Sequence, residues 1–417
     1  MNKYYVEFTE EMKKDYTILA PNMLPLQLSL VANVLRSEGY NVELLENNGP
    51  QIPEIGLKYT HNDTCYPAIL VIGQFMDALL SGKYDLNKVA LIYFQTGGGC
   101  RASNYISLIR KALKNAGMEQ IPVISFSFAG LEKHSGFKLS LSALRKTIYA
   151  VLYGDVLFLL RNQCKPYELE KGASQAMADN YCRVLEERMR KDGISFKKFK
   201  KNCQELLEAF ASIPRSTEKK VQVGIVGEIY VKFSPLGNNN LEQLLVDNGA
   251  EVTIPGLFDF FLYCVYNNVV HYKLYREGKL KYPVLKLVYN FLIKKQKEII
   301  DLINSHGVFR APGSFAKTVT LIKDYIGQGC KMGEGWLLPA EMLELAHGGV
   351  ENIVCTQPFG CLPNHICGKG MMKPIKDKNP NVNIVAIDYD ASASKVNQEN
   401  RIKLMLANAK KPEKSVV

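Results

Sequence analysis

Roughly the first 130 residues of this chain alternate between short apolar runs and longer segments with helical spacing of apolar residues. The apolar runs suit buried strands; they are YTILA (16–20), NVELLE (41–46), KVALIYFQ (88–95) and IPVISFS (121–127). The helical segments that lie between them are PLQLSLVANVLRSEGY (25–40), YPAILVIGQFMDALLSGKY (66–84) and NYISLIRKALKNAG (104–117). Strands that alternate with helices predict a parallel sheet with helices on both faces.

The pattern changes after residue 139. Three helical segments with few strand signals follow: LSALRKTIYAVLYGDVLFLLRN (141–162), ASQAMADNYCRVLEERMRKDG (173–193) and FKKFKKNCQELLEAFASI (196–213). A second alternating region begins with the strand-like VQVGIVGEIYV (221–231) and ends with a helical pattern, QENRIKLMLANAKK (398–411). We therefore predict an α/β protein with two Rossmann-like, flavodoxin-like domains, residues 1–139 and 221–417, joined by a helical connector, residues 140–220.

Composition limits the class of protein. The chain has 417 residues, 47% of them hydrophobic, which is enough for a sizeable core and more than one domain. Its start lacks an apolar signal region. The most apolar segment, residues 252–270, contains Pro255, Gly256 and Asp259, so we interpret it as a buried loop and helix and not as a membrane span. We expect a soluble, cytoplasmic protein with no membrane partner.

The net charge of +11 comes from lysines spread along helices and loops. No nucleic-acid-binding motif accompanies them, so we predict no nucleic-acid partner. A solvated surface explains such charges most simply. An acidic partner protein and a phosphate-bearing ligand are the alternatives.

The ten cysteines fall into two classes. Disulfides are not expected in the cytoplasm. Four cysteines lie within helical patterns and are expected to be ordinary buried apolar residues: Cys164, Cys182, Cys203 and Cys264. The other six lie at strand ends, at helix starts or in loops, where ligands bind in open α/β sheets: Cys65, Cys100, Cys330, Cys355, Cys361 and Cys367.

Two of these six cysteines have neighbours that favour a thiolate. Cys65 lies at the start of a helix, and Cys100 follows three consecutive glycines. Helix N-termini and glycine-rich backbone amides supply partial positive charge. We expect the amides of the glycines to approach an inorganic sulfide; these cofactor-binding candidates are Gly97, Gly98 and Gly99. The same glycines resemble a phosphate loop, but they lack the Lys-Ser or Lys-Thr that follows in one.

Spacing alone leaves three kinds of site open. Structural zinc prefers close cysteine pairs, and the chain has no C-x-x-C. A catalytic cysteine needs a base such as His365, but this leaves the other cysteines unexplained. An iron–sulfur cluster tolerates wide spacing because the fold brings its ligands together, and it fits best. His365 and Glu334 are candidate acid–base groups, although His365 could also cap a helix and Glu334 is supported only by its place in a loop.

Five stretches carry motifs more specific than cysteine spacing. They are LKYTHNDTCYPAILVIGQFMDAL (57–79), TGGGCRASNYISLIRKAL (96–113), GEIYVKFSPLGNNNLEQLLVDNGAEV (227–252), GEGWLLPAEM (333–342) and VCTQPFGCLPNHICGKGM (354–371). Together they resemble the 2-hydroxyacyl-CoA dehydratase and activase-associated superfamily over nearly the whole chain. Within it, they are most similar to double-cubane cluster proteins and to the C-terminal module of large activase-related proteins.

The resemblance implies an oxygen-sensitive iron–sulfur oxidoreductase. Members of the superfamily receive low-potential electrons from a separate, dimeric activator that hydrolyses ATP and carries its own [4Fe–4S] cluster. Dehydratase members bind one [4Fe–4S] cubane through three cysteines, and an open iron site meets an acyl-CoA thioester. Double-cubane members hold an [8Fe–9S] cluster through six cysteines and reduce small molecules. A homodimer with the cluster in the cleft between its two α/β domains is also implied.

Position by position, the resemblance assigns four cysteines to recurrent motifs: Cys65, Cys100, Cys355 and Cys361. Cys330 and Cys367 lie where cysteine is not always present in the wider superfamily. Six thiolates equal two cubanes with three ligands each, which favours the [8Fe–9S] cluster. Four ligands with two bystanders would instead complete one closed [4Fe–4S] cluster. The alternatives are therefore a dehydratase subunit and a non-catalytic electron-transfer module, and the physiological substrate is not predicted.

Overall fold

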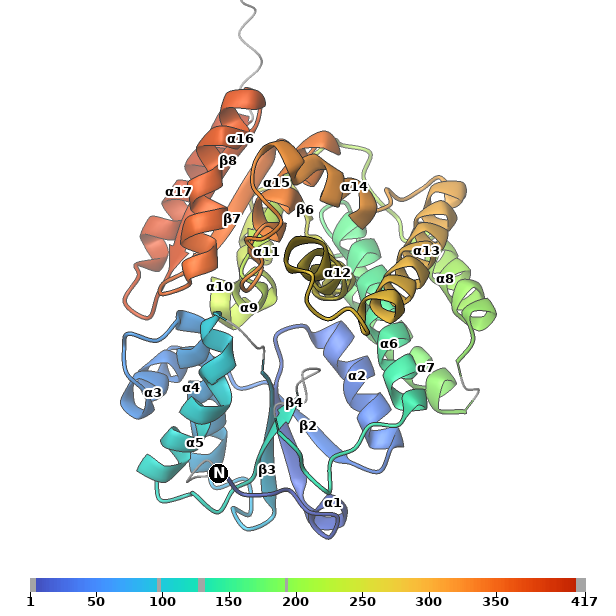
Figure 1. Cartoon of the computed structure of the whole chain (residues 1–417). Coiled ribbons are helices and arrows are strands. Elements are labelled where there is room, and N and C mark those ends of the chain that lie inside the picture. Colours follow the sequence, from blue (N-terminus) through green and yellow to red (C-terminus); the bar gives the residue numbers. More distant parts are fainter. Residues whose placement is uncertain (1–4, 96–98, 127–131, 192–193, 410–417) are drawn as a thin grey trace, which may run out of the picture.

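A computed structural model describes residues 5–95, 99–126, 132–191 and 194–409, and it contains two four-stranded sheets (Figure 1). All strand pairs within these sheets are parallel. The first sheet has the order β2-β1-β3-β4, with strands β1 (Thr17–Pro21), β2 (Asn41–Leu45), β3 (Val89–Phe94) and β4 (Val123–Phe126). The second has the equivalent order β6-β5-β7-β8, with strands β5 (Val221–Gly227), β6 (Ala250–Thr253), β7 (Asn352–Pro358) and β8 (Asn383–Tyr389). The prediction of two Rossmann-like parallel sheets is confirmed.

The first unit has five α-helices among its described residues: α1 (Met12–Asp15), α2 (Pro25–Ser37), α3 (Gln51–Tyr59), α4 (Tyr66–Leu80) and α5 (Tyr105–Asn115). Helix α2 lies on one side of the sheet, and α3, α4 and α5 lie on the other (Figure 1). Helix α3 is not among the segments that the sequence predicts to be helical. This helix packs against α4 through two glycines, because a Cβ on Gly56 would lie 2.1 Å from the carbonyl oxygen of Ile69, and one on Gly73 would lie 2.0 Å from that of Ile52. A glycine inside a helical pattern lowers the expectation of a helix, although here it permits close packing.

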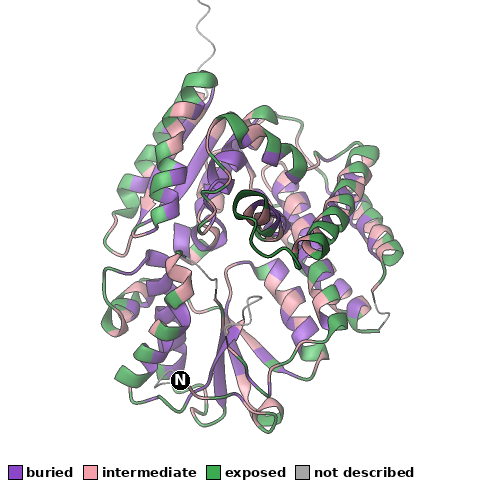
Figure 2. Ribbon diagram, viewed as in Figure 1, coloured by how far each residue is buried: buried purple, intermediate pink, exposed green. Residues whose placement is uncertain are grey.

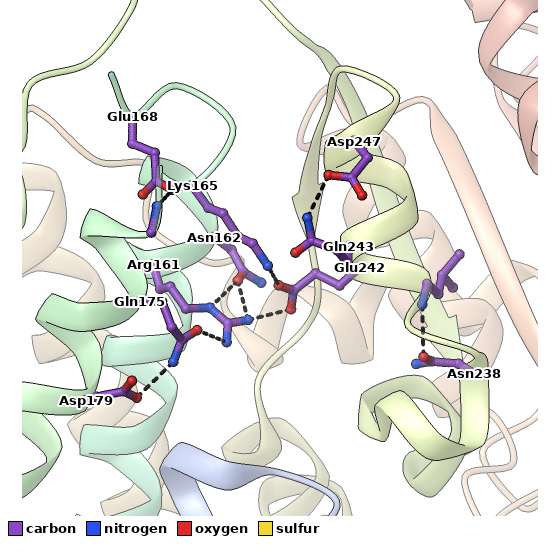
Figure 3. Close-up of polar contacts among 12 residues, drawn as sticks. Arg161, Asn162, Lys165, Glu168, Gln175, Asp179, Asn238, Glu242, Gln243 and Asp247 are labelled. Carbon is purple, nitrogen blue, oxygen red and sulfur yellow. Dashed lines mark hydrogen bonds and ion pairs between the residues drawn. The ribbon is translucent and has the colours of Figure 1, made fainter. Parts of the chain in front are cut away.

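The predicted helical connector contains α6 (Leu141–Cys164), α7 (Ala173–Lys191) and α8 (Phe196–Ala211), with no named strand among its described residues. Helix α6 packs against α2 of the first unit and against β6 of the second. Arg161 of α6 and Lys165, directly after this helix, both pair with Glu242 of the second unit; the Lys165 ammonium lies 2.8 Å from the carboxylate (Figure 3). The connector thus joins the two units, and its boundaries at 139/140 and 220/221 stay predictions.

The second unit carries the remaining α-helices of the described chain. They are α9 (Ile229–Phe233), α10 (Pro235–Asn238), α11 (Leu241–Asp247), α12 (Leu257–Tyr275), α13 (Tyr282–His306), α14 (Phe315–Leu321), α15 (Leu337–His347), α16 (Met372–Lys378) and α17 (Lys395–Ala409). Short turns of other helix types are η1 (Arg101–Asn104), η2 (Ile322–Asp324), η3 (Asn364–Gly368, a π-helix) and η4 (Lys369–Met371). Among the described residues, no helix is both long and apolar enough to cross a membrane.

One strand boundary in the second unit differs from the prediction. The apolar run 221–231 predicted a continuous strand, but β5 ends at Gly227 and α9 follows. Gly227 has φ +147°, and a Cβ there would lie 2.1 Å from the Thr356 Oγ1 atom of β7. The chain turns at this glycine because only glycine fits so close to the neighbouring strand. Burial follows the layers, with purple sheets beneath helices that are green on their outer faces (Figure 2).

Candidate functional site

A cavity of about 470 Å³ lies where segments that follow the strands of both sheets meet. We call it the cysteine cavity, because its wall includes the side chains of Cys65, Cys100, Cys264 and Cys361 together with two carboxyl groups, those of Glu228 and Glu334. Segments after β3, β5 and β7 all reach it. Ligands of open parallel sheets bind at such carboxyl ends, beside the point where the strand order reverses.

Backbone contacts between the two units bring Cys65 and Cys361 together. Cys65 lies directly before α4, and the next amide, that of Tyr66, donates to the carbonyl oxygen of Phe359 at 3.0 Å. Gly360 has φ +74°, and a Cβ there would lie 3.2 Å from the Cys65 Cα atom. A glycine therefore allows the loop after β7 to approach the start of α4 this closely.

Cys100 reaches the cavity from the loop after β3. Opposite it lies Gly333, with φ +57°, where a Cβ would be 3.6 Å from the Cys100 sulfur. Of the three predicted sulfide-binding glycines, Gly97 and Gly98 lie outside the described residues. The Gly99 amide donates to the Met332 sulfur at 3.2 Å, so in this structure it binds the opposite loop.

The other three predicted ligands do not line the cysteine cavity. We call Cys330, Cys355 and Cys367 the second cysteine group. Cys355 is buried in β7, and a Cβ on Gly368 would lie 3.5 Å from its sulfur. Cys367 precedes that glycine, and burial together with the nearby Cys330 raises the pKa of the Cys367 thiol to about 11. Cys330 itself is exposed.

Two buried amides connect the cavity with the second cysteine group. The Asn364 side chain donates to the Cys361 sulfur at 3.3 Å, and the Gln357 side chain donates to the Cys355 sulfur at 3.5 Å and to the Asn364 carbonyl oxygen at 3.2 Å. The side-chain oxygens of Gln357 and Asn364 are buried and have no hydrogen-bond partner in the described chain. Orphaned polar atoms of this kind fit a site that a further group completes.

The thiols in the protein without metal are held in the protonated form. Burial raises the pKa of Cys65, of Cys361 and of Cys100, the last to about 12. Amides at Ala68 and Ala102 act in the opposite direction, toward the thiolates of Cys65 and Cys100, but the loss of hydration is the larger effect. Such thiols release their protons only when a positive centre binds them, so metal binding here would release protons.

Glu228 and Glu334 form a pair of carboxyl groups on the cavity wall. The Glu334 carboxylate accepts the Ile229 amide at 3.0 Å, and that of Glu228 accepts the Val231 amide at 2.9 Å. Burial and the charge of Glu334 raise the pKa of Glu228 to about 8, and burial also raises that of Glu334. The sequence analysis missed Glu228, although its position directly after β5 was the signal.

The structure places His365 and Cys264 in surroundings that differ from those expected for their predicted roles. His365 is exposed on η3, and the cavity lining does not include it. Cys264 of α12 was expected to be an ordinary buried residue, but it is exposed toward the cavity. Asn267 and Asn268 lie three and four residues further on, so they share its helix face and also line the cavity. The other three helical cysteines are buried, as predicted: Cys164, Cys182 and Cys203.

No group of three or more histidine, cysteine, aspartate or glutamate side chains within the described ranges is placed to hold one metal ion. In a cubane cluster each thiolate binds a different iron atom, so the ligands of such a cluster need not converge on one point. No protein-family model matches the chain, and no match was found among curated proteins. The superfamily resemblance therefore stays a prediction.

Proposed function

We propose that this protein is an iron–sulfur oxidoreductase that uses low-potential electrons to reduce a small substrate. The observation that carries the proposal is that three of the six predicted ligands, Cys65, Cys100 and Cys361, line one cavity. Of the other three, Cys367 lies near Cys330 and directly before Gly368, which borders the Cys355 sulfur. Three thiolates are the ligand set of one cubane when its fourth iron stays open or is bridged. Two such sets suit a double-cubane [8Fe–9S] cluster.

The residues present fit such a group. Glycines border the thiols: Gly360 lies against Cys65, Gly333 lies near the Cys100 sulfur, and Gly368 lies near the Cys355 sulfur. The amide hydrogens of the Gln357 and Asn364 side chains point at the sulfurs of Cys355 and Cys361, where they would stabilise added negative charge. When bound, the cluster supplies electron transfer at low potential. The chain supplies ligands, hydrogen bonds and a covered space.

The carboxyl pair gives the cavity a proton source. Glu228 holds a proton near neutral pH because its pKa lies at about 8, and Glu334 lies on the same wall. A reduced substrate needs protons as well as electrons, so these carboxyl groups are suited to deliver them. Glu334 is thus favoured over the exposed His365 as the acid–base group.

The proposal includes a separate electron donor, an ATP-hydrolysing activator with its own [4Fe–4S] cluster. It also includes a homodimeric, cytoplasmic protein and a small-molecule substrate. These parts follow from the resemblance of the sequence motifs to the superfamily, and the cysteine cavity is the place where such a substrate would meet the cluster.

A second candidate function is a dehydratase subunit for 2-hydroxyacyl-CoA. The observation in its favour is that Cys65, Cys100 and Cys361 alone among the six predicted ligands line the cavity. Three thiolates there would hold one [4Fe–4S] cluster with an open iron. The second cysteine group would then have a structural role.

Anaerobic purification followed by iron and sulfide analysis separates the candidates. About eight irons per chain support the double cubane, and about four support the single cubane. Assays with activator and ATP then compare acetylene reduction with dehydration of a 2-hydroxyacyl-CoA. A cluster without either activity points to an electron-transfer module, and an iron-free chain contradicts the proposal.

A further inference from the structure

An exposed apolar surface runs from the end of α12 along the first half of α13. Its members are large hydrophobic side chains open to solvent: Leu274, Tyr275, Leu280, Val284, Leu287, Val288 and Phe291. We call these seven residues the α12–α13 apolar surface. Leu280 is 91% exposed and Leu287 72% exposed, so neither contributes to the core. In Figure 2 the turn between the two helices and much of α13 are green.

The α13 part of this surface is a stripe along one side of the helix. Positions 284, 287, 288 and 291 follow the spacing of one helix face. The buried face of α13, which includes Leu292, Gln296 and Ile299, points in a different direction, toward α8 and α12. The exposed stripe is therefore separate from the buried residues that pack α13 against the rest of the protein. Contiguous exposed apolar residues of this extent mark interaction sites.

Positive charges border the apolar surface. Exposed cationic side chains at the turn and at the next helical turn after Phe291 are Lys273, Arg276, Lys279, Lys281 and Lys294. Within the part of the chain that the structure describes, none of the five has an ion-pair partner. One carboxylate, Glu277, lies among them, and it already pairs with His271 at 2.9 Å. The surface thus has an apolar centre and a positive border.

This surface adjoins the mouth of the cysteine cavity. A Cβ on Gly329 would lie 3.5 Å from Leu274 Cδ1 and 3.7 Å from the Tyr275 hydroxyl. Two residues later, the Lys331 ammonium contacts His271 Nδ1 at 2.6 Å, and Lys331 itself lines the cavity. A protein bound over α12 and α13 would therefore touch the loop that forms one wall of the cavity.

We propose that the α12–α13 apolar surface is the docking site of an acidic electron-donor protein. The positive border fits an acidic partner, whereas a second copy would bring five unpaired cations against five others. The place beside the cavity fits an electron donor, because electron delivery requires the two redox centres to be close. The proposed identity of the partner rests on the proposed function, but the surface itself rests on exposure and charge.

The experiment measures binding of the ATP-hydrolysing activator from the same organism to the anaerobically purified chain. The double variant Leu280→Asp/Leu287→Asp should weaken binding about tenfold or more, because both leucines would lose burial at the centre of the interface. The pair Lys279→Glu/Lys281→Glu should weaken it by a similar factor and reduce its dependence on salt. A matched control is Leu169→Asp, since Leu169 is 70% exposed but lies outside this surface.

Iron content and oligomeric state are measured on the same samples. An iron-loaded chain whose affinity for the activator is unchanged by both double variants overturns the docking site and leaves the cluster proposal intact. A change from dimer to monomer in Leu280→Asp/Leu287→Asp, with activator binding unchanged, overturns it in favour of a second copy. Flotation of the chain with phosphatidylglycerol vesicles is also measured. If Leu280→Asp/Leu287→Asp abolishes this flotation and leaves activator binding unchanged, the docking site is overturned in favour of a membrane surface.

Discussion

The two groups of cysteines have different surroundings. The cysteine cavity has thiols from both units around an open space with two carboxyl groups. In the second cysteine group, Cys355 lies within the sheet, Cys367 is buried on η3 and Cys330 is exposed on a loop. Among the six predicted ligands, the three of the first group line this cavity. Under the proposed function, the cavity group would meet the substrate, and the second group would have a structural or electronic role.

Replacement of a cavity cysteine should have the largest effect on activity. In Cys361→Ser, loss of one of three ligands beside the substrate should lower activator-dependent reduction about 100-fold or more and should also lower iron content. Cys264→Ser is the matched control, because its thiol faces the same cavity but is not a proposed ligand. Equal losses in both variants would contradict the assignment of ligands.

Replacement of a cysteine in the second group tests the other half of the comparison. For Cys355→Ala we expect iron to fall from about eight to about four per chain, with one cubane left at the cavity. Iron and sulfide analysis with electron paramagnetic resonance measures this. Unchanged iron content in Cys355→Ala and in Cys330→Ala/Cys367→Ala would make these cysteines bystanders and favour the single cubane.

Close packing at the cavity predicts a difference between two glycines with the same backbone angle. Gly360 and Gly82 both have φ +74°, but a Cβ on Gly82 would meet nothing within 4 Å, whereas one on Gly360 would press on Cys65. Gly82→Ala should lower the free energy of unfolding by about 1 kcal/mol, and Gly360→Ala by about 2–3 kcal/mol. Urea unfolding measures both values. Equal losses would mean that the approach of Gly360 to Cys65 does not constrain the fold.

The carboxyl pair predicts how stability depends on pH in the metal-free chain. Glu228 has a pKa near 8 when folded, raised from its ordinary value of 4.5, so between these pH values the folded chain holds a proton that the unfolded chain releases. The contribution of this proton to the free energy of unfolding is fully present below about pH 4.5. It decreases by roughly 1 kcal/mol per pH unit as the pH rises toward 8. Glu228→Gln should flatten that slope in thermal unfolding. An unchanged slope would show that Glu228 does not hold the proton.

The sequence predicted the two parallel sheets because the alternation of apolar runs and helices leaves few other topologies. It also predicted six cysteine ligands for one cluster site. Three of them line the cysteine cavity, namely Cys65, Cys100 and Cys361, and the other three do not. The sequence did not predict the end of β5 at Gly227, because that turn depends on the contact with Thr356, far along the chain. It also did not predict α3, because Gly56 weakens the helical pattern although it permits close packing against Ile69 of α4. The exposure of Cys264 was missed for a related reason: a helical pattern gives the face of a residue but not what lies opposite.

The positions of the irons test the central claim most directly. Crystals of the protein, purified and grown without oxygen, would be measured at the iron absorption edge to locate iron by anomalous scattering. The account predicts iron against the sulfurs of Cys65, Cys100 and Cys361, with a second group of irons beside Cys330, Cys355 and Cys367. Crystals with no iron at the cysteine cavity, from protein that is active, would contradict it.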